Sequence, residues 1–427
     1  MLHPGTKYLP GTLKFRYFFR VQPELLPEKT RILTDFPVFF PAIAGTFTGT
    51  FAGCQHKPKE YILIPMNISK TSMDLWEYLS AERRPIALYG TGDGADKIIA
   101  VLENLGLSDL ITAVFASDGF VRNRSFHGFK VMSYSDCCHA LENRDFIVLV
   151  CFGSSRPEVL EQVAKIASEH ELYVPDVPVY GTNLFDRGFY ESRIDDIEEV
   201  FSHFKDGISR SCFENYISYK LTGDISYLEK CESDPDDEFA LLKDISGGCY
   251  IDLGAYYGDT LVRFLNRFPC LEKAVAVEPE RHSFAKLKAC AEKLDDGFDI
   301  RCINALAGSK TGTELVSNSR GRGTRALANS NTALANTREI EVITVDSLKL
   351  DDVSFIKFDV EGSELEAVEG AKETILNSRP LMKIACYHRS EDVFAIVKKV
   401  LEIRDDYKVY MRHTRCIPGW DTDFYFI

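Results

Sequence analysis

The sequence shows no excess of positive charge, no cysteine pair with the spacing of a metal site (the closest two, Cys137 and Cys138, are adjacent) and no uninterrupted apolar run long enough to cross a membrane. Its 427 residues carry a formal net charge of −14, which argues against nonspecific nucleic-acid binding and against an anionic membrane surface as a partner. The 12 cysteines include no C-x-x-C pair, so no metal site of the zinc type is expected. Scattered cysteines in a chain of this length favour reduced thiols and a cytoplasmic protein.

Residues 1–65 have some features of a targeting segment. A few basic residues precede an apolar run that ends at Cys54, as they would in a secretory signal. Prolines interrupt this run, which begins too far from the start of the chain for a signal peptide and is too broken for a membrane span. We therefore predict a poorly ordered extension and no stable membrane insertion, and the native start could lie at Met66 or Met73.

Strand-like and helix-like patterns alternate in two parts of the chain, which predicts an α/β protein with two Rossmann-like, doubly wound domains. Residues 66–185 form the first predicted domain and residues 248–427 the second. Residues 186–247 between them have a helical, acidic pattern, and we interpret them as a connector that packs beside the second domain. The strands predicted for the first domain are 86–90, 111–116 and 146–152.

The most informative stretch runs from Tyr250 to Thr260 and combines an apolar strand, an acid and two glycines. A strand followed by a glycine turn at a helix N-terminus is how an α/β sheet cradles a nucleotide-like cofactor. A dinucleotide fingerprint differs in its glycine spacing, whereas the order Asp252, Gly254, Gly258 is the pattern of S-adenosylmethionine (SAM) sites. Glycines let the backbone lie against the methionine part, and Asp252 is predicted to lie near the positive charges of SAM.

A second acid supports a SAM site. The apolar run 274–277 ends at Glu278, which follows Gly258 at the distance where a nucleotide-binding βαβ unit places an acid for the ribose hydroxyls. An ordinary βαβ unit with a surface glutamate would give a similar pattern. The combination with the glycine turn favours the SAM site.

Two further strand ends carry polar residues. Asp359 and Glu361 follow one apolar strand and His388 follows the next, and ligands of open α/β sheets bind outside such strand ends. Methyl transfer to an alcohol needs alignment and a base for the hydroxyl proton. His388 fits the base by residue type, and Asp359 is its rival. Without a catalytic function, Asp359 would be a carboxylate at the start of a helix and His388 a hydrogen-bonded surface histidine. The two acids could hold a divalent metal, but the sequence offers too few ligands to favour one.

Residues 248–427 contain seven predicted strands, five of them parallel and two in a terminal antiparallel hairpin. Their ranges are 249–253, 274–277, 299–304, 354–359, 381–387, 407–412 and 423–427. This arrangement fits the sheet of SAM-dependent methyltransferases, with one more strand at 339–345 or nearby. The polar segment 309–337 is predicted to be a long loop or hairpin, at a position where active-site lids occur.

These motifs resemble the FkbM family of methyltransferases over residues 249–427. The resemblance rests on the glycine turn, on Val277-Glu-Pro279, on Cys302-Ile-Asn-Ala-Leu306 and above all on Phe355-Ile-Lys-Phe-Asp-Val-Glu-Gly-Ser-Glu-Leu-Glu366. It implies SAM as the cofactor and O-methylation of a hydroxyl in a sugar or polyketide. It also implies that Glu278 holds the ribose and that Asn304 and Ala305 lie by the adenine.

Together, the residues and the resemblance define a predicted site. The predicted cofactor-binding residues are Asp252, Gly254, Tyr256, Gly258, Thr260, Glu278, Asn304, Ala305 and Asp359. The predicted catalytic residues are His388, Asp359 and Glu361, and no metal is predicted. The predicted partner is a small-molecule or saccharide acceptor. A non-catalytic SAM-binding protein is one alternative.

The first domain leaves a second alternative open. Its sequence resembles the longer bacterial FkbM members from about residue 70, and the run Gly90-Thr-Gly-Asp-Gly-Ala95 satisfies the G-x-G-x-x-A pattern. This permits NAD, and hence a sugar or sugar-nucleotide oxidoreductase. However, Asp93 places a negative charge where a pyrophosphate would lie, and Asp118 is farther on than is ideal for ribose. Otherwise the domain positions the substrate or forms a homo-oligomer.

Overall fold

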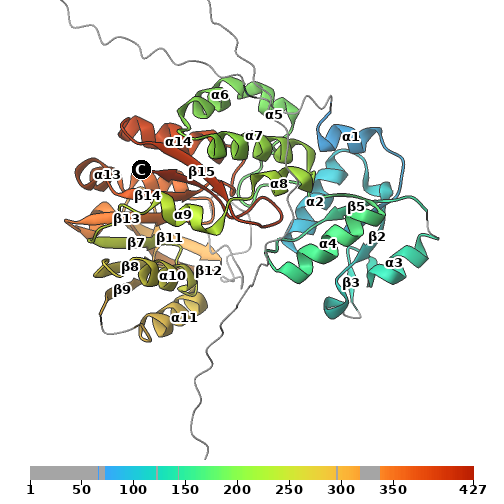
Figure 1. Cartoon of the computed structure of the whole chain (residues 1–427). Coiled ribbons are helices and arrows are strands. Elements are labelled where there is room, and N and C mark those ends of the chain that lie inside the picture. Colours follow the sequence, from blue (N-terminus) through green and yellow to red (C-terminus); the bar gives the residue numbers. More distant parts are fainter. Residues whose placement is uncertain (1–65, 67–72, 122–123, 143, 295–296, 318–336) are drawn as a thin grey trace, which may run out of the picture. The chain divides into compact units, whose positions relative to one another are not determined.

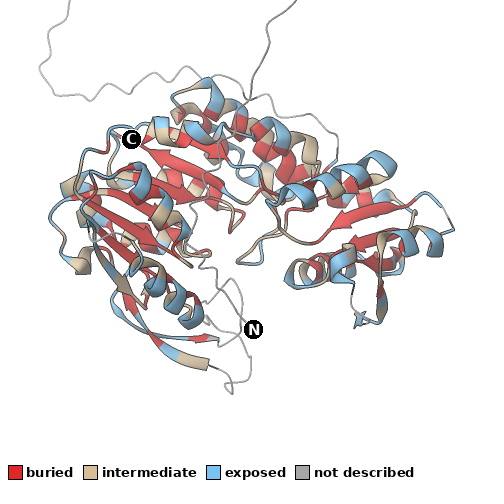
Figure 2. Ribbon diagram, turned by 60° about the horizontal axis from the view of Figure 1, so that its bottom comes forward, coloured by how far each residue is buried: buried red, intermediate tan, exposed pale blue. Residues whose placement is uncertain are grey.

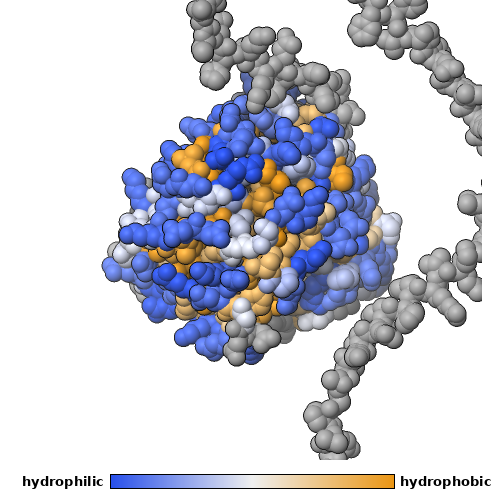
Figure 3. Space-filling view, turned by 60° about the vertical axis from the view of Figure 1, so that its left-hand side comes forward, coloured by the Kyte–Doolittle hydropathy of each residue, from blue (hydrophilic) through white to orange (hydrophobic). Residues whose placement is uncertain are grey.

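The computed structural model describes residue 66 and residues 73–427, with gaps at 122–123, 143, 295–296 and 318–336 (Figure 1). The predictions for residues 1–65 lie outside the described residues. In the part of the chain that is described, none of the helices combines the length and the apolar character that a bilayer crossing requires. The face shown in Figure 3 is largely hydrophilic, with small apolar areas between polar side chains.

A six-stranded sheet with the order β3-β4-β2-β1-β5-β6 lies in the first part of the described chain. All neighbours are parallel except β3 and β4, which form an antiparallel pair. The strands are β1 Ile86–Tyr89, β2 Ile111–Phe115, β3 Ser125–Phe126, β4 Phe129–Met132, β5 Ile147–Val150 and β6 Glu171–Tyr173. The helices are α1 Leu75–Ala81, α2 Asp93–Asn104, α3 Tyr134–Ala140 and α4 Pro157–Glu169, with short 3₁₀ turns η1 Ser108–Leu110 and η2 Asp118–Phe120. This part of the chain is therefore α/β with a mainly parallel sheet.

Five helices follow this sheet. They are α5 Arg187–Ser192, α6 Ile194–His203, α7 Gly207–Thr222, α8 Ile225–Cys231 and α9 Pro235–Leu241. The longest, α7, begins at the Asp206 cap and ends at Gly223, which adopts the left-handed conformation favoured by glycine. It buries Phe213, Tyr216 and Ile217 and contacts a strand of the second sheet. The apolar residues at helical spacing are therefore core, as the sequence predicts.

A seven-stranded sheet with the order β15-β16-β14-β13-β7-β8-β9 forms the second α/β layer (yellow to red in Figure 1). Its strands are β7 Cys249–Leu253, β8 Lys273–Val277, β9 Asp299–Ile303, β13 Val353–Phe358, β14 Leu381–Ala385, β15 Val409–His413 and β16 Thr422–Phe426. Its helices are α10 Asp259–Arg267, α11 Arg281–Ala291, α12 Glu364–Glu369, α13 Lys372–Ser378 and α14 Asp392–Ile403. All seven predicted strands are present, and β16 is antiparallel to both neighbours.

The central strands are buried on both faces because helices cover the sheet on each side (Figure 2). This explains why they are continuous apolar runs in the sequence. The chain runs from β7 outward through β8 to β9 and then returns to the other side of β7 as β13. The order therefore reverses between β7 and β13, and ligands of open α/β sheets bind at such a switch point.

A separate three-stranded sheet corrects one prediction. It consists of β10 Leu306–Ala307, β11 Gly312–Ser317 and β12 Thr337–Ile343, followed by the 3₁₀ turn η4 Asp346–Leu348. The strand predicted near 339–345 belongs to this sheet and does not extend the seven-stranded one. β11 and β12 pair in antiparallel orientation. Of the two forms predicted for the segment 309–337, a loop or a hairpin, its described ends therefore fit the hairpin. The residues between them, 318–336, lie outside the described residues.

Candidate active site

A cavity of about 190 Å³ lies at the carboxyl ends of β7, β8 and β13, at the switch point. Seven of the predicted site residues line it: Gly254, Tyr256, Thr260, Glu278, Ala305, Asp359 and Glu361. The other four, Asp252, Gly258, Asn304 and His388, do not. The other twelve lining residues include Lys357, Tyr387 and Asp421, to which the sequence assigned no role. A larger cavity of about 1260 Å³ near α6 and α14 contains none of the predicted residues.

The turn after β7 requires glycine because two strand ends approach each other closely there. Gly254 has a φ of +76°, and a Cβ at this position would collide with the backbone carbonyl oxygen of Asp359. Its amide donates to the carbonyl oxygen of Val277 over 2.9 Å. Gly258 has a φ of +87° and caps α10, where a Cβ would press on Leu287 and Cys290. The glycines therefore shape the turn itself, and only Gly254 borders the cavity.

Asp252 is not at the cavity surface, contrary to its predicted contact with the cofactor. Its side chain is fully buried and forms an ion pair with Lys357, whose Nζ lies 3.2 Å from Asp252 Oδ1. The same Nζ lies 3.4 Å from Asp359 Oδ2 and donates to the carbonyl oxygen of Gly254 over 3.1 Å. Burial raises the pKa of Asp252 although Lys357 opposes it. Asp252 therefore acts on the cavity through Lys357, which does line it.

Glu278 is buried at the end of β8 and faces the cavity. Its two carboxylate oxygens accept hydrogen bonds from the amides of Tyr256, over 2.9 Å, and Glu280, over 2.7 Å. Burial raises the pKa of Glu278 to about 7, although the two amides oppose the rise. The side chain amide of Asn304 donates to the carbonyl oxygens of Glu278 and Pro279. Asn304 therefore holds the loop after β8, and the neighbouring Ala305 borders the cavity.

The raised pKa of Glu278 predicts a pH-dependent affinity. Ribose hydroxyls donate hydrogen bonds to a carboxylate, so the affinity for adenosine should fall as the pH drops through about 7. A single group with this pKa predicts a loss of about tenfold between about pH 8 and pH 6. Calorimetric titration with adenosine measures it, and Glu278→Gln should bind weakly with a flat pH profile. A flat profile in the unaltered protein would show that Glu278 does not contact the ribose.

Asp359 lies directly beyond β13 and is half-buried at the cavity wall. The hydroxyl of Tyr387 donates to its Oδ1 over 3.1 Å, and Lys357 pairs with its Oδ2. Burial opposes ionisation of Asp359, but Lys357 and the imidazole of His388 outweigh burial and hold its pKa below the ordinary value. A fixed negative charge therefore borders the cavity.

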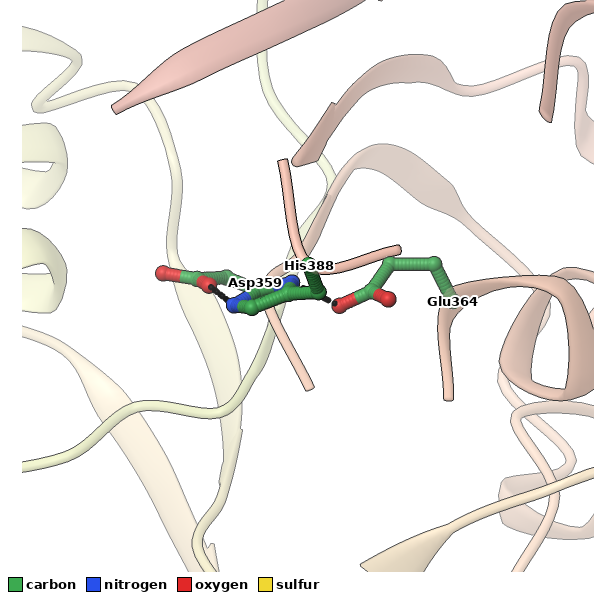
Figure 4. A group of neighbouring side chains, drawn as sticks. All are labelled: Asp359, Glu364 and His388. Atoms are coloured by element: carbon green, nitrogen blue, oxygen red, sulfur yellow. Dashed lines mark ion pairs between the residues drawn. The ribbon is translucent and has the colours of Figure 1, made fainter. Parts of the chain in front are cut away.

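His388 lies behind this wall and is 1% exposed. Its Nδ1 lies 2.9 Å from Glu364 Oε1 and its Nε2 lies 3.6 Å from Asp359 Oδ1 (Figure 4). The same Nε2 lies 3.7 Å from Glu361 Oε2. Burial lowers the pKa of His388, but Glu364 and the other two carboxylates outweigh burial and raise it to about 9. The prediction of His388 as the general base is therefore not supported, since the imidazole holds a proton at neutral pH and does not line the cavity.

The glycine turn of the first sheet is also tightly packed. A Cβ on Gly90 would press on Phe152, and one on Gly94 would collide with the carbonyl oxygen of Cys151. Such contacts bring helix α2 close to the sheet. Asp93 is exposed and pairs with Lys97 over 2.9 Å. A cavity of about 360 Å³ near this sheet is lined by other residues, so the predicted NAD site stays a prediction.

Comparison with known proteins agrees with this geometry. Residues 252–409 match the model of the methyltransferase FkbM domain. This region is an FkbM methyltransferase domain. The chain is similar in fold to the crystal structure of a methyltransferase FkbM from Methylobacillus flagellatus KT, at 18% identity and a TM-score of 0.59, covering 82% of this chain and 92% of that one.

A weaker structural similarity concerns an rRNA methylase from Streptococcus thermophilus, with 12% identity and a TM-score of 0.30, covering 45% of this chain and 96% of that one. No curated protein matches the chain significantly. The FkbM domain makes the chain a SAM-dependent methyltransferase, with SAM as its cofactor. The cavity of this FkbM domain fits SAM, since it combines a glycine turn with a buried acid at the next strand end.

Proposed function

We propose that the chain transfers the methyl group of SAM to a hydroxyl of a saccharide or a related small molecule. One observation supports this above all. The cavity joins the glycine turn and Glu278, which suit a cofactor with a ribose, to Asp359, Glu361 and Tyr387, which suit a polar acceptor. Both reactants would then be held side by side, which is the main requirement of an in-line displacement.

In this proposal each part of the cavity has one role. The Gly254 turn borders the methionine part of SAM, Glu278 accepts hydrogen bonds from the ribose, and Ala305 borders the adenine. Asp359 accepts the proton of the acceptor hydroxyl, a role that the sequence analysis preferred for His388. As the new C–O bond forms, the bond between the methyl carbon and the sulfonium breaks and the O–H proton passes to the carboxylate. His388 positions Asp359 from behind.

The charge of the cavity favours a neutral acceptor over a sugar nucleotide. Its lining includes six carboxylates: Asp259, Glu278, Glu280, Asp359, Glu361 and Asp421. Within the described residues, Lys357 is the one basic side chain that lines it, and that ammonium is already paired with Asp252 and Asp359. A phosphate group would meet repulsion here, whereas sugar hydroxyls could donate hydrogen bonds to these acids.

The substitution Asp359→Asn tests the proposed role of Asp359. We expect SAM affinity to change by less than about threefold, while the rate of S-adenosylhomocysteine formation with a panel of neutral saccharides falls by about 10²–10⁴-fold, the usual contribution of a positioned base. Calorimetry measures the first quantity and chromatography the second. Asp351→Asn, at an exposed carboxylate outside the cavity, is the matched control.

Two outcomes would contradict the proposal. SAM binding without transfer to any hydroxyl would favour the non-catalytic alternative, and NAD binding in place of SAM would favour the oxidoreductase. The finer predictions of a cytoplasmic location and a homo-oligomer stay part of the proposal. All cysteines of the described residues are free thiols, which fits a reducing compartment.

A further inference from the structure

The two edges of the His388 ring have different surroundings. On the inner edge, Nδ1 forms an ion pair with Oε1 of the buried Glu364 over 2.9 Å, and this oxygen accepts a hydrogen bond from the amide of Val360 over 2.9 Å. On the outer edge, Nε2 points between Asp359 and Glu361, at 3.6 and 3.7 Å. Both outer distances are too long for a hydrogen bond. A histidine that is 1% exposed thus directs Nε2 at two carboxylates of the cavity wall, with both of which it forms long ion pairs.

These outer distances match those between two ligands of one metal ion. Metal–nitrogen and metal–oxygen bonds of about 2.0–2.2 Å place two ligand atoms about 3–4 Å apart, depending on the angle at the metal. In addition, one ligand atom each from Asp359, Glu364 and His388 lies within 4.8 Å of the others. A metal-binding histidine characteristically donates its second ring nitrogen to a carboxylate, which is the position of Glu364 (Figure 4).

The backbone around these groups is held firmly. Glu361 has a φ of +57°, which is uncommon for a residue other than glycine, and Gly362 after it packs against Tyr180. The amide of Arg389 donates to Asp392 Oδ2 over 2.8 Å and fixes the segment after β14. The ligand positions are therefore set by the fold, so that binding would require little rearrangement.

We propose that Asp359, Glu361 and Nε2 of His388 bind a divalent cation, and that Glu364 orients the imidazole for it. The mixed set of one nitrogen and two carboxylates suits a cation of the Mn²⁺ type. Ca²⁺ prefers six to eight oxygen ligands and fits less well. From the sequence, a divalent metal on Asp359 and Glu361 was disfavoured because too few ligands were apparent, whereas in the fold His388, which follows β14, approaches both carboxylates.

The role of the cation in methyl transfer rests on the proposed function, whereas the binding of the cation to the protein does not depend on it. Asp359 and Glu361 line the cavity, so the cation would lie on its acceptor side and bind the hydroxyl oxygen. A bound cation would lower the pKa of that hydroxyl, and the proton would pass to Asp359, the base of the proposed function, as the methyl group leaves SAM. The cation is neither oxidised nor reduced in this step.

Calorimetric titration of the chelator-treated full chain with MnCl₂, together with electron paramagnetic resonance of free Mn²⁺, tests the site. We expect one Mn²⁺ per chain, with Mg²⁺ and Ca²⁺ binding more weakly. Glu361→Gln and Glu364→Gln should each weaken binding by about 10–100-fold, the first by removing a ligand and the second by releasing the imidazole. Asp351→Asn should leave the affinity unchanged.

Glu361 is half-buried at the cavity wall, so its substitution should preserve the fold. Absence of Mn²⁺ binding, or binding that Glu361→Gln leaves intact, would overturn the proposal and leave an imidazolium held by three carboxylates. Binding that is lost in Glu361→Gln supports the site even if no saccharide is methylated. The cation site and the proposed acceptor can therefore fail separately.

Discussion

Replacing Gly254 with alanine is expected to abolish SAM binding and to lower the free energy of unfolding by about 2–4 kcal/mol. The φ of +76° disfavours any residue with a Cβ, and this Cβ would collide with the backbone carbonyl oxygen of Asp359. A backbone oxygen cannot turn away as a side chain can, so β7 and β13 must separate at their carboxyl ends. Because these ends form the cavity wall, binding and stability should fall together. Calorimetry with SAM and urea denaturation measure the two effects.

The matched control is Gly312→Ala. No atom lies within 4 Å of a Cβ at Gly312, and its φ is not positive. We expect SAM affinity and stability close to those of the unaltered chain. If Gly254→Ala also kept both, the described approach of β7 to β13 would be wrong.

The second large effect is expected for Lys357→Met, which should destabilise the fold by about 3–5 kcal/mol. Lys357 is the ion-pair partner of the fully buried Asp252, and a carboxylate left without its counter-charge in the core is costly. Burial already raises the pKa of Asp252, and it will rise further without Lys357. A folded-state pKa above the unfolded one means that the penalty grows as pH rises and shrinks in mild acid. Urea denaturation over a range of pH measures this.

A double-mutant cycle separates the charge from the packing. Adding Asp252→Asn to Lys357→Met removes the unpaired charge, so the double variant should be more stable than Lys357→Met alone near neutral pH. Lys372→Met, at an exposed lysine in α13, is the control for loss of an ammonium at the surface. A double variant no better than the single one would show that the ion pair contributes little.

The fold was largely predictable because its central strands are buried on both faces. Strands such as β7 and β13 are therefore continuous apolar runs between turn residues, and all seven strands of this sheet were predicted. In contrast, β3 and β6 contain two and three residues, too few for a periodic pattern. The strand β12 was recognised but was assigned to the wrong sheet, because periodicity does not reveal the pairing partner.

The position of a site residue was predictable where it depends only on the end of its strand. Gly254, Glu278 and Asp359 meet because the carboxyl ends of parallel strands lie at one edge. The direction of a side chain is not encoded so locally, which is why Asp252 was placed in the cavity although it faces a buried lysine. Lys357 did leave a signal, since a lysine within an apolar strand needs a charged partner nearby.

The order of strands in the second sheet has a consequence for cooperative folding. The matched region 252–409 begins inside β7 and ends at the first residue of β15, so it omits β16, which lies between β14 and β15 and pairs with both. A fragment cut at these limits would lose an interior strand and leave the edge of β14 open to other chains. It would also lose α7, which packs on β15. Sequence similarity and autonomous folding thus divide this chain at different places.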